Sequence, residues 1–375
     1  MLSELYKDYF SIDPKYYPAV NAELIRSGRV KWDSFYPHET FVNLLEKIHI
    51  MLSGKDSRSL WVEGAYGVGK SHAVLTAKSL LEVADDEVRE YFQEYGLSAD
   101  LCQKLITDRK SGQLITVHRI GSSDIRSDRD LIVAVQESVS NALREHHIEN
   151  RGEISLREAA LKWLEEKDAN RNFFNDLIHE EKYAWDFGGR SVDEVIDALK
   201  RVDDPTSVTA MMKHIMQVAD DNGITALRLN MSALCNWIKN VLDQNRDRIS
   251  AIVFFWDEFT EYFKNNQNSL TGFQELVEIS QTHPFFFLIV THESKSLISD
   301  KGMQRKIMNR FIGDGAIRIE IPENIAFKLL AQAMKLTEDP VLRNDWLEDI
   351  EALNDKLADV RKAIIDSAKK HLTEN

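Results

Sequence analysis

Cysteine is scarce in this chain, with only Cys102 and Cys235 among 375 residues. Two isolated cysteines cannot build a disulfide framework, and they lack the clustered spacing of a zinc site. The 11 histidines show no metal-ligand spacing either, and the adjacent pair His146-His147 is best interpreted as exposed helix residues. We therefore expect neither a disulfide scaffold nor a zinc centre, and a reducing environment.

Long apolar runs are also missing, and so is an excess of positive charge. No run approaches the roughly 20 residues of a membrane-spanning helix, and residues 1–8 lack the apolar segment of a secretory signal. Lys and Arg number 47 against 61 Asp and Glu, which gives a net charge of -14. We expect a cytoplasmic protein with no membrane partner, whose net charge does not indicate DNA binding. A local basic patch at Arg119, Arg126 and Arg129 is one reading of that segment, and a solvated loop is the other.

The most informative motif is a glycine-rich loop between an apolar strand and a helix. A strand is expected at 60–62 and a helix at 71–81, and the intervening residues fit the pattern G-x-x-x-x-G-K-[ST]. Glycines let backbone N–H groups approach phosphate oxygens, and a helix N-terminus favours negative charge. We predict that this phosphate cradle, which includes His72 at its end, binds a nucleotide through Gly64, Ala65, Tyr66, Gly67, Val68, Gly69, Lys70, Ser71 and His72. Lys70 would reach the β and γ phosphates, and Ser71 would ligate Mg²⁺.

A second motif follows a continuous apolar run at 249–256, which is typical of a buried parallel strand. The run ends in Asp257 and Glu258. Because ligands of open α/β sheets bind at the carboxyl ends of strands, we expect this pair beside the cradle. Asp257 would support Mg²⁺ and Glu258 would polarise the attacking water. The alternative is that both acids merely cap the strand and open the helix 259–263.

A third apolar strand is expected at 284–291, where Thr291 and then His292 supply polar groups. Thr291 is the first choice for contacting the γ-phosphate or the lytic water, and His292 is the second; an ordinary strand end is the alternative. A basic helical segment at 300–311 contains Arg310, and an alternating strand follows at 316–322.

This order of elements resembles the AAA+ division of P-loop ATPases, over residues from about 30 to about 334. The resemblance identifies 64–71 as Walker A, Asp257-Glu258 as Walker B, Thr291 as the sensor-1 position and Arg310 as an arginine finger. It implies an α/β P-loop NTPase fold, with a parallel sheet flanked by helices. For Arg310 the alternative is a surface or salt-bridged arginine.

The two Walker motifs lie much farther apart than in a compact AAA+ core. A strand at 114–120 and a helix at 130–145 supply core elements, which leaves a charged helical insertion. We therefore expect an N-terminal segment packing on the core at 1–55, core at 56–145, insertion at 146–223, core at 224–322 and a partial helical lid at 323–375. The insertion resembles those of KAP-type ATPases and of the large ATPases of bacterial phage-defence systems such as BREX.

The terminal segments carry weaker signals. Tyr36, Pro37 and His38 are candidates for covering an adenine by position, or else they pack the N-terminal segment onto the core. After Pro322 we expect a helix at 324–335, a break at Asp339-Pro340 and a helix at 344–371. The lid looks incomplete, so the chain is expected to be an N-terminal portion of a larger protein or a subunit that a partner completes.

The resemblance implies an ATPase that uses ATP and Mg²⁺ and assembles as a homo-oligomer or with a partner protein. Lys70, Glu258, Thr291 and Arg310 are its catalytic candidates, and Ser71 and Asp257 its metal ligands. An antiviral role follows from the phage-defence likeness alone. Alternatives are an ATP-dependent oligomeric switch or scaffold with little hydrolysis, a small-molecule kinase, and a DNA-remodelling or loading ATPase.

Overall fold

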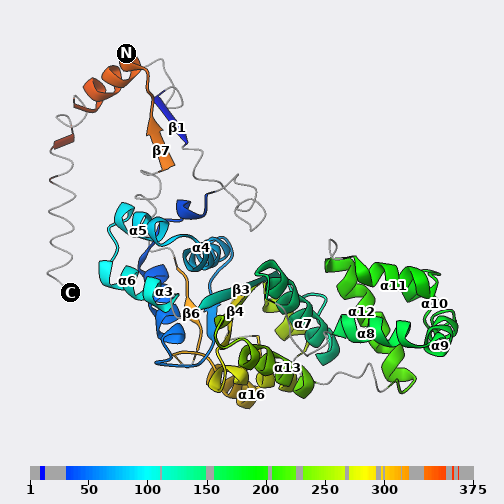
Figure 1. The fold of residues 1–375 in the computed structure, drawn as a ribbon. Coiled ribbons are helices and arrows are strands. Elements are labelled where there is room, and N and C mark those ends of the chain that lie inside the picture. The colour runs from blue at the N-terminus through cyan, green and yellow to red at the C-terminus, as the bar shows by residue number, and fades with distance from the viewer. Residues whose placement is uncertain are drawn as a thin grey trace. The chain divides into compact units, whose positions relative to one another are not determined.

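The computed structural model divides the chain into two compact units (Figure 1). One comprises Pro37–Glu320, and the other combines Met1–Tyr36 with Ile321–Asn375. These limits differ from the boundaries at residues 55 and 322 that the sequence predicts. The smaller unit is defined by contacts between the two ends of the chain, which the sequence does not reveal. The structure describes residues 9–12, 31–109, 112–148, 156–201, 205–224, 231–266, 270–292, 297–298, 300–313, 315–320, 333–351, 357–358 and 362.

The larger unit is built on a parallel sheet of five strands, in the order β3-β4-β5-β2-β6. The strands are β2 Leu60–Glu63, β3 Gln113–Ile120, β4 Ile249–Asp257, β5 Phe285–Thr291 and β6 Ile317–Arg318. All seven residues of β5 and eight of the nine in β4 are buried, as expected for strands covered on both faces. The expected α/β architecture with a parallel sheet is therefore confirmed.

Helices cover both faces of the sheet, and alternation along the strands assigns residues to each face. On one face, Ile252, Phe254 and Trp256 of β4 join a large apolar cluster with side chains of α7, α13 and α15. On the other, α4 packs against β3 and β4. The helices of this unit outside the insertion are α3 Glu39–Leu52, α4 Lys70–Glu82, α5 Asp85–Glu94, α6 Ala99–Asp108, α7 Asp128–Glu145, α13 Met231–Gln244, α14 Thr260–Asn265, α15 Thr271–Glu278, the 3₁₀ turn η3 Ile279–Gln281 and α16 Lys301–Met308.

The insertion is helical where the structure describes it. Its helices are α8 Leu156–Glu166, α9 Asp168–Ile178, α10 Ala184–Phe187, α11 Val192–Lys200 and α12 Pro205–Asp221. Local sequence sets their limits: Ser191 and Glu194 form a capping box that starts α11. Helix α12 packs along α7, and the insertion's buried side chains, such as Phe174, Phe187 and Leu199, belong to the same apolar cluster as the sheet face. The insertion therefore shares its hydrophobic core with the rest of the unit.

The smaller unit contains a two-stranded antiparallel sheet of β1 Phe10–Ile12 and β7 Met334–Leu336, together with the 3₁₀ turn η1 Trp32–Ser34. The predicted helix at 324–335 is wrong at its end, because Met334 and Lys335 are strand residues paired with Ile12 and Ser11. That pairing joins distant parts of the chain, so local periodicity could not reveal it; residues 321–332 lie outside the described part. A helix runs through 340–351, and Asp339 Oδ1 accepts the Val341 N–H at its start. The predicted break at Asp339-Pro340 is confirmed.

Candidate functional site

The glycine loop joins β2 to α4 at the carboxyl edge of the sheet. Gly67 and Gly69 both have φ of 81°, a left-handed conformation that glycine adopts at little cost, and Gly69 caps α4. Ala65, Tyr66 and Gly67 are exposed, so the loop presents its backbone to solvent directly before a helix N-terminus. A loop of this kind is suited to receive an anion.

Gly64 fixes the root of this loop between two neighbouring strands. A Cβ at this position would lie 2.5 Å from the Ile319 carbonyl oxygen, beside β6, and 3.0 Å from Val68 Cγ2. The Gly64 N–H donates to the His292 carbonyl, beyond β5, at 2.9 Å. Only glycine fits there without displacing main chain, which gives a physical reason for the first glycine of the motif.

Lys70 lies beneath the loop and is buried, with 8% of its surface exposed. Its Nζ donates to the Ala65 carbonyl at 2.8 Å, so the side chain folds back along the loop. Burial lowers the pKa of the Lys70 ammonium, and the negative charge of Asp257 opposes that shift. The lysine and the aspartate therefore lie within electrostatic reach of each other, although they are far apart in sequence.

Asp257 is the last residue of β4 and is buried. It alternates with Val253 and Phe255, so it lies on the sheet face that α4 covers. Ser71 is half-buried in the first turn of that helix. Both offer oxygen atoms, which Mg²⁺ prefers, and a magnesium ion commonly keeps several waters with only one or two protein ligands. The donor set therefore fits a nucleotide-bound Mg²⁺. No cluster of three or more His, Cys, Asp or Glu able to hold a metal by itself occurs in the described part of the chain.

Glu258 is exposed, and its backbone is strained. Its φ is 55°, which is unfavourable for a residue with a Cβ. The Glu258 N–H donates to Asp257 Oδ1 at 2.8 Å, and its carbonyl accepts from Ser122 Oγ at 3.1 Å. Non-glycine residues in this conformation concentrate at functional sites, where the surrounding structure over-determines them. The strain therefore marks Glu258 as a position whose placement the fold enforces.

The polar end of β5 lies between the two motifs, because β5 separates β2 from β4. Thr291 is 1% exposed, and its Oγ1 accepts the Trp61 indole N–H at 2.8 Å. Trp61 belongs to the apolar cluster on the face away from α4. His292 is exposed, and its ring lies 5.9 Å from that of Tyr66 in the glycine loop. The geometry thus places the second-choice residue, His292, next to the cradle, and gives Thr291 a partner in the core.

Arg310 lies beside the amino-terminal end of β2, whereas the glycine loop lies at the carboxyl-terminal end of that strand. Its carbonyl accepts the Ser59 N–H, just before β2 begins. Five residues of extended chain span roughly 16 Å. Its guanidinium pairs with Glu278, with Nε donating to Oε1 at 2.8 Å. Within this chain Arg310 is a salt-bridged arginine, and it does not meet the cradle that Lys70 serves.

The other candidate residues are a histidine of the cradle, residues before α3 and two arginines of the basic patch. Burial lowers the pKa of His72 to about 4, so its imidazole is neutral at neutral pH. His38 is buried, with Nδ1 2.8 Å from Thr40 Oγ1, while Tyr36 belongs to the other unit. Arg119 and Arg129 pair with Asp124 and Asp220, so those two charges of the basic patch are offset.

The two cysteines are free and buried, as expected for a chain without a disulfide framework. Burial raises the pKa of the Cys235 thiol to about 11, which makes it unreactive. Among the described residues, no helix is long and apolar enough to cross a membrane.

Sequence reasoning missed one segment of the site, the loop 121–127 between β3 and α7, which we call the coupling loop. Its Gly121 N–H donates to the Asp257 carbonyl at 2.9 Å, and Ser122 contacts Glu258. Backbone groups and one serine hydroxyl make these contacts. Such groups produce no recognisable pattern in the amino-acid sequence. The adjacency of β3 and β4 in the sheet was the only signal that could have suggested them.

Comparison of the chain with protein-family models, with curated proteins and with solved structures finds no match in any of the three. The interpretation of the site therefore rests on its residues and their geometry.

Proposed function

We propose that this chain binds and hydrolyses ATP as a protein of the AAA+ type, and couples Mg-ATP turnover to conformational change or assembly. One observation carries the proposal: a glycine loop leads from β2 into α4 at the carboxyl ends of a parallel sheet, with buried Lys70 in the first turn of α4 and buried Asp257 at the carboxyl end of β4. A cation, a carboxylate and an anion-binding loop in this arrangement suit a nucleotide triphosphate with its magnesium ion.

The position of each residue in the site suggests its role in binding or hydrolysis. The glycine loop and Lys70 would hold the phosphates, while Ser71 and Asp257 would hold Mg²⁺, which supplies charge neutralisation at the phosphoryl oxygens. Glu258, exposed beside Asp257, would orient the attacking water. His292 is better placed than Thr291 to meet the terminal phosphate, because its ring lies near Tyr66 of the loop.

Arg310 enters this proposal only through a second chain. It lies at the far edge from its own cradle, so a neighbouring subunit would have to present it. An arginine supplied in trans is worth about 10³–10⁵ in rate, so an isolated chain should turn over slowly. Assembly would then switch on hydrolysis. An antiviral role belongs to the proposal through the phage-defence likeness alone, and a cytoplasmic location through the composition of the sequence.

The same position of Arg310 favours a second candidate, an ATP-dependent oligomeric switch with little hydrolysis. DNA remodelling is less favoured, because Arg119 and Arg129 are already paired with acids. A kinase is less favoured, because an acidic pair at the end of a separate strand, Asp257-Glu258, and a long helical insertion fit that class poorly.

Phosphate release measured against protein concentration tests the proposal. We expect the specific rate to rise steeply with concentration, and Glu258→Gln to lower it by roughly 10²-fold or more while ATP binding persists, since the water loses its base. Double-stranded DNA, added in parallel, should not change the rate. A wild-type protein that binds ATP with no turnover at any concentration would support the switch, and turnover unaffected by Glu258→Gln would contradict the assignment.

A further inference from the structure

The coupling loop holds the strained residue Glu258 from the side of the sheet where β3 lies. Ser122 is 1% exposed, and its Oγ both donates to the Glu258 carbonyl at 3.1 Å and accepts the Tyr262 N–H at 2.9 Å. The Trp256 indole N–H donates to the Gly121 carbonyl at 2.8 Å. Hydrogen bonds thus attach the loop to the chain on both sides of Glu258. A backbone in the left-handed region persists only with support of this kind.

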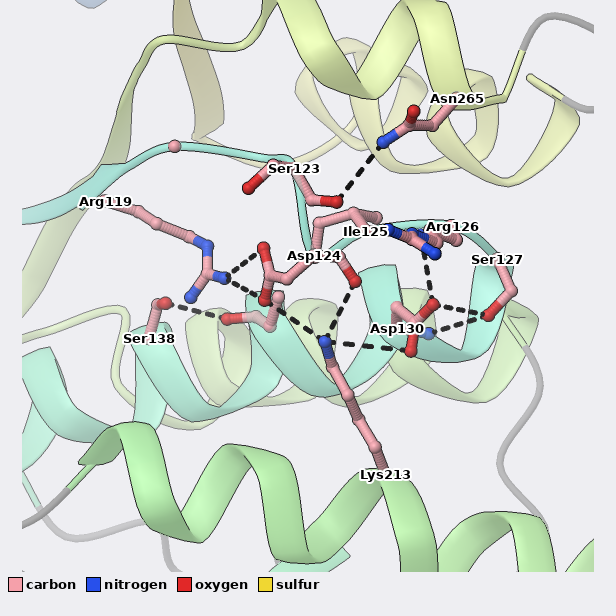
Figure 2. A network of polar contacts seen from close by, with 12 residues as sticks. Arg119, Ser123, Asp124, Ile125, Arg126, Ser127, Asp130, Ser138, Lys213 and Asn265 are labelled. Carbon is pink, nitrogen blue, oxygen red and sulfur yellow. Dashed lines mark hydrogen bonds and ion pairs between the residues drawn. The ribbon is translucent and has the colours of Figure 1, made fainter. Parts of the chain in front are cut away.

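The other side of the same loop is attached to the insertion (Figure 2). Lys213 of α12 reaches across to the loop, and its Nζ contacts both the Asp124 carbonyl oxygen and Asp124 Oδ2 at 3.1 Å. The same ammonium lies 3.7 Å from Asp130 Oδ1, in the first turn of α7. Arg119 of β3 pairs with Asp124 at 3.0 Å. One lysine of the insertion therefore joins the loop and the start of α7.

Charge balance makes Lys213 important to this cluster. Two carboxylates, Asp124 and Asp130, face two cations, Arg119 and Lys213, and the Lys213 side chain is only 18% exposed. Burial alone would raise the pKa of Asp124, but the charges of Arg119 and Lys213 outweigh it and leave that pKa below its usual value. Without Lys213, Asp124 and Asp130 would share one cation, and the Asp124 carbonyl would lose its contact with α12. Asn265 and Asn266 would still hold Ser123 and Ile125, so we expect a local shift of the loop at Asp124.

We propose that Lys213 is a positioning residue through which the helical insertion controls ATP turnover. The path runs from α12 through Lys213 to Asp124, along the coupling loop to Ser122, and from Ser122 to the backbone of Glu258. A local displacement of Lys213 on α12, for instance on contact with a partner, would shift Asp124 and, through Ser122, the backbone of Glu258 away from the position from which it orients water. This inference rests on the proposed function, because it assigns a means of regulation to that same site.

Two substitutions of Lys213 and two control variants separate this role from general stabilisation. Lys213→Met removes the charge, and Lys213→Arg keeps it. Arg129→Gln breaks a different ion pair between α7 and α12, the one to Asp220, without touching the coupling loop. Lys182→Met removes a lysine that pairs with α12 inside the insertion, at Asp221. Each variant is prepared as the full chain and is examined for turnover, for ATP affinity and for hydrogen exchange without nucleotide.

We expect Lys213→Met to lower kcat by roughly ten- to a hundredfold with KM and ATP affinity nearly unchanged, because a small displacement of a catalytic group has effects of that size. Lys213→Arg should restore most of the rate, and the Arg129→Gln and Lys182→Met proteins should resemble the wild type. In nucleotide-free protein, the amides of Gly121 and Tyr262, which join the coupling loop to Asp257 and to α14, should exchange faster in Lys213→Met than in either control.

Exchange at those amides that is equal in Lys213→Met and Lys182→Met would overturn the inference, whatever the rates. Loss of ATP affinity and stability in both Lys213 variants would overturn it as well, since that is the result of a merely structural residue. Because hydrogen exchange uses no nucleotide, failure of the wild type to bind or hydrolyse ATP would count against the proposed function alone.

Discussion

At the scale of single residues, the site depends on backbone positions that restrict which side chain can stand there. Gly64 is limited by space, since a Cβ would press on the Ile319 carbonyl. Gly67 and Gly69 are limited by conformation, and Glu258 holds an unfavourable φ that a glycine would adopt more easily. Glycine would adopt this conformation at a lower backbone energy than glutamate does. A glutamate at such a position is therefore a candidate for a functional role of its carboxylate.

Substitution of Gly64 by alanine should destabilise the protein by about 1–3 kcal/mol, because backbone must move to admit one methyl group. Gly315→Ala is the matched control in the same region, since a Cβ there meets nothing within 4 Å; it should change stability by less than about 0.5 kcal/mol. Urea unfolding of both variants measures the difference. Equal stability of the two would show that the packing at Gly64 adjusts freely.

Substitutions of Thr291 and of His292 should have opposite effects on stability and turnover, which distinguishes the roles of the two residues. Thr291→Val leaves the buried Trp61 N–H without its acceptor and should cost about 1–3 kcal/mol of stability with little loss of turnover. His292→Ala should leave stability nearly unchanged and lower turnover. Chemical unfolding and phosphate release on both proteins give the answer. If the valine variant loses turnover while the alanine variant keeps it, Thr291 is the sensor that its sequence position suggests.

At the scale of elements, the sequence predicted most of the sheet, because its strands are short, apolar on both faces and bounded by polar residues. The predicted limits of β2, β4 and β5 agree with the structure to within a residue. β6 is shorter than its alternating pattern indicated, with only Ile317 and Arg318 in the ladder. β7 was predicted as helix because its partner, β1, lies at the other end of the chain.

The candidate site was foreseen where side chains carry the chemistry and missed where backbone does. Asp257 was predicted to lie beside the cradle, and its charge acts on the pKa of Lys70; the nucleotide-binding role of both residues stays a prediction. The roles of Ser122 and Lys213 were not foreseen, because a hydroxyl bonded to a carbonyl and a lysine on a surface helix have no distinctive spacing. The burial of Thr291 depends on the face of β5 that it occupies, and a fully apolar strand does not reveal its faces.

The insertion and the part of the unit that holds the parallel sheet should unfold together, since their buried side chains form one apolar cluster. Phe187→Ala in the insertion, where Phe187 is fully buried, should cost about 3–5 kcal/mol and lower the midpoint of one shared transition. Phe173→Ala is the control, because Phe173 is 47% exposed, and it should cost far less. Unfolding followed by circular dichroism and by tryptophan fluorescence should coincide. A separate early transition of the insertion would show that the two parts are independent.

At the scale of the whole molecule, the residues of the proposed hydrolytic site lie at opposite ends of the strands of one sheet. The cradle, Asp257 and Glu258 lie at the carboxyl edge, and Arg310 lies beside the beginning of β2. We expect a chain organised in this way to bind nucleotide by itself and to complete the proposed site only with a neighbour. The insertion, joined through Lys213 to the loop at the carboxyl end of β3, would give such an assembly a second input.

Nucleotide binding underlies all of these expectations, and equilibrium titration of the full chain with Mg-ATP measures it. We expect the wild type and Lys78→Ala to bind alike, because Lys78 lies in the same helix and pairs with Glu82 away from the loop. Lys70→Ala should bind roughly ten- to a hundredfold more weakly, since it loses a charge-assisted contact to phosphate. A wild type that does not bind Mg-ATP, or a Lys70→Ala protein that binds it equally well, would contradict the assignment of this loop as a nucleotide site.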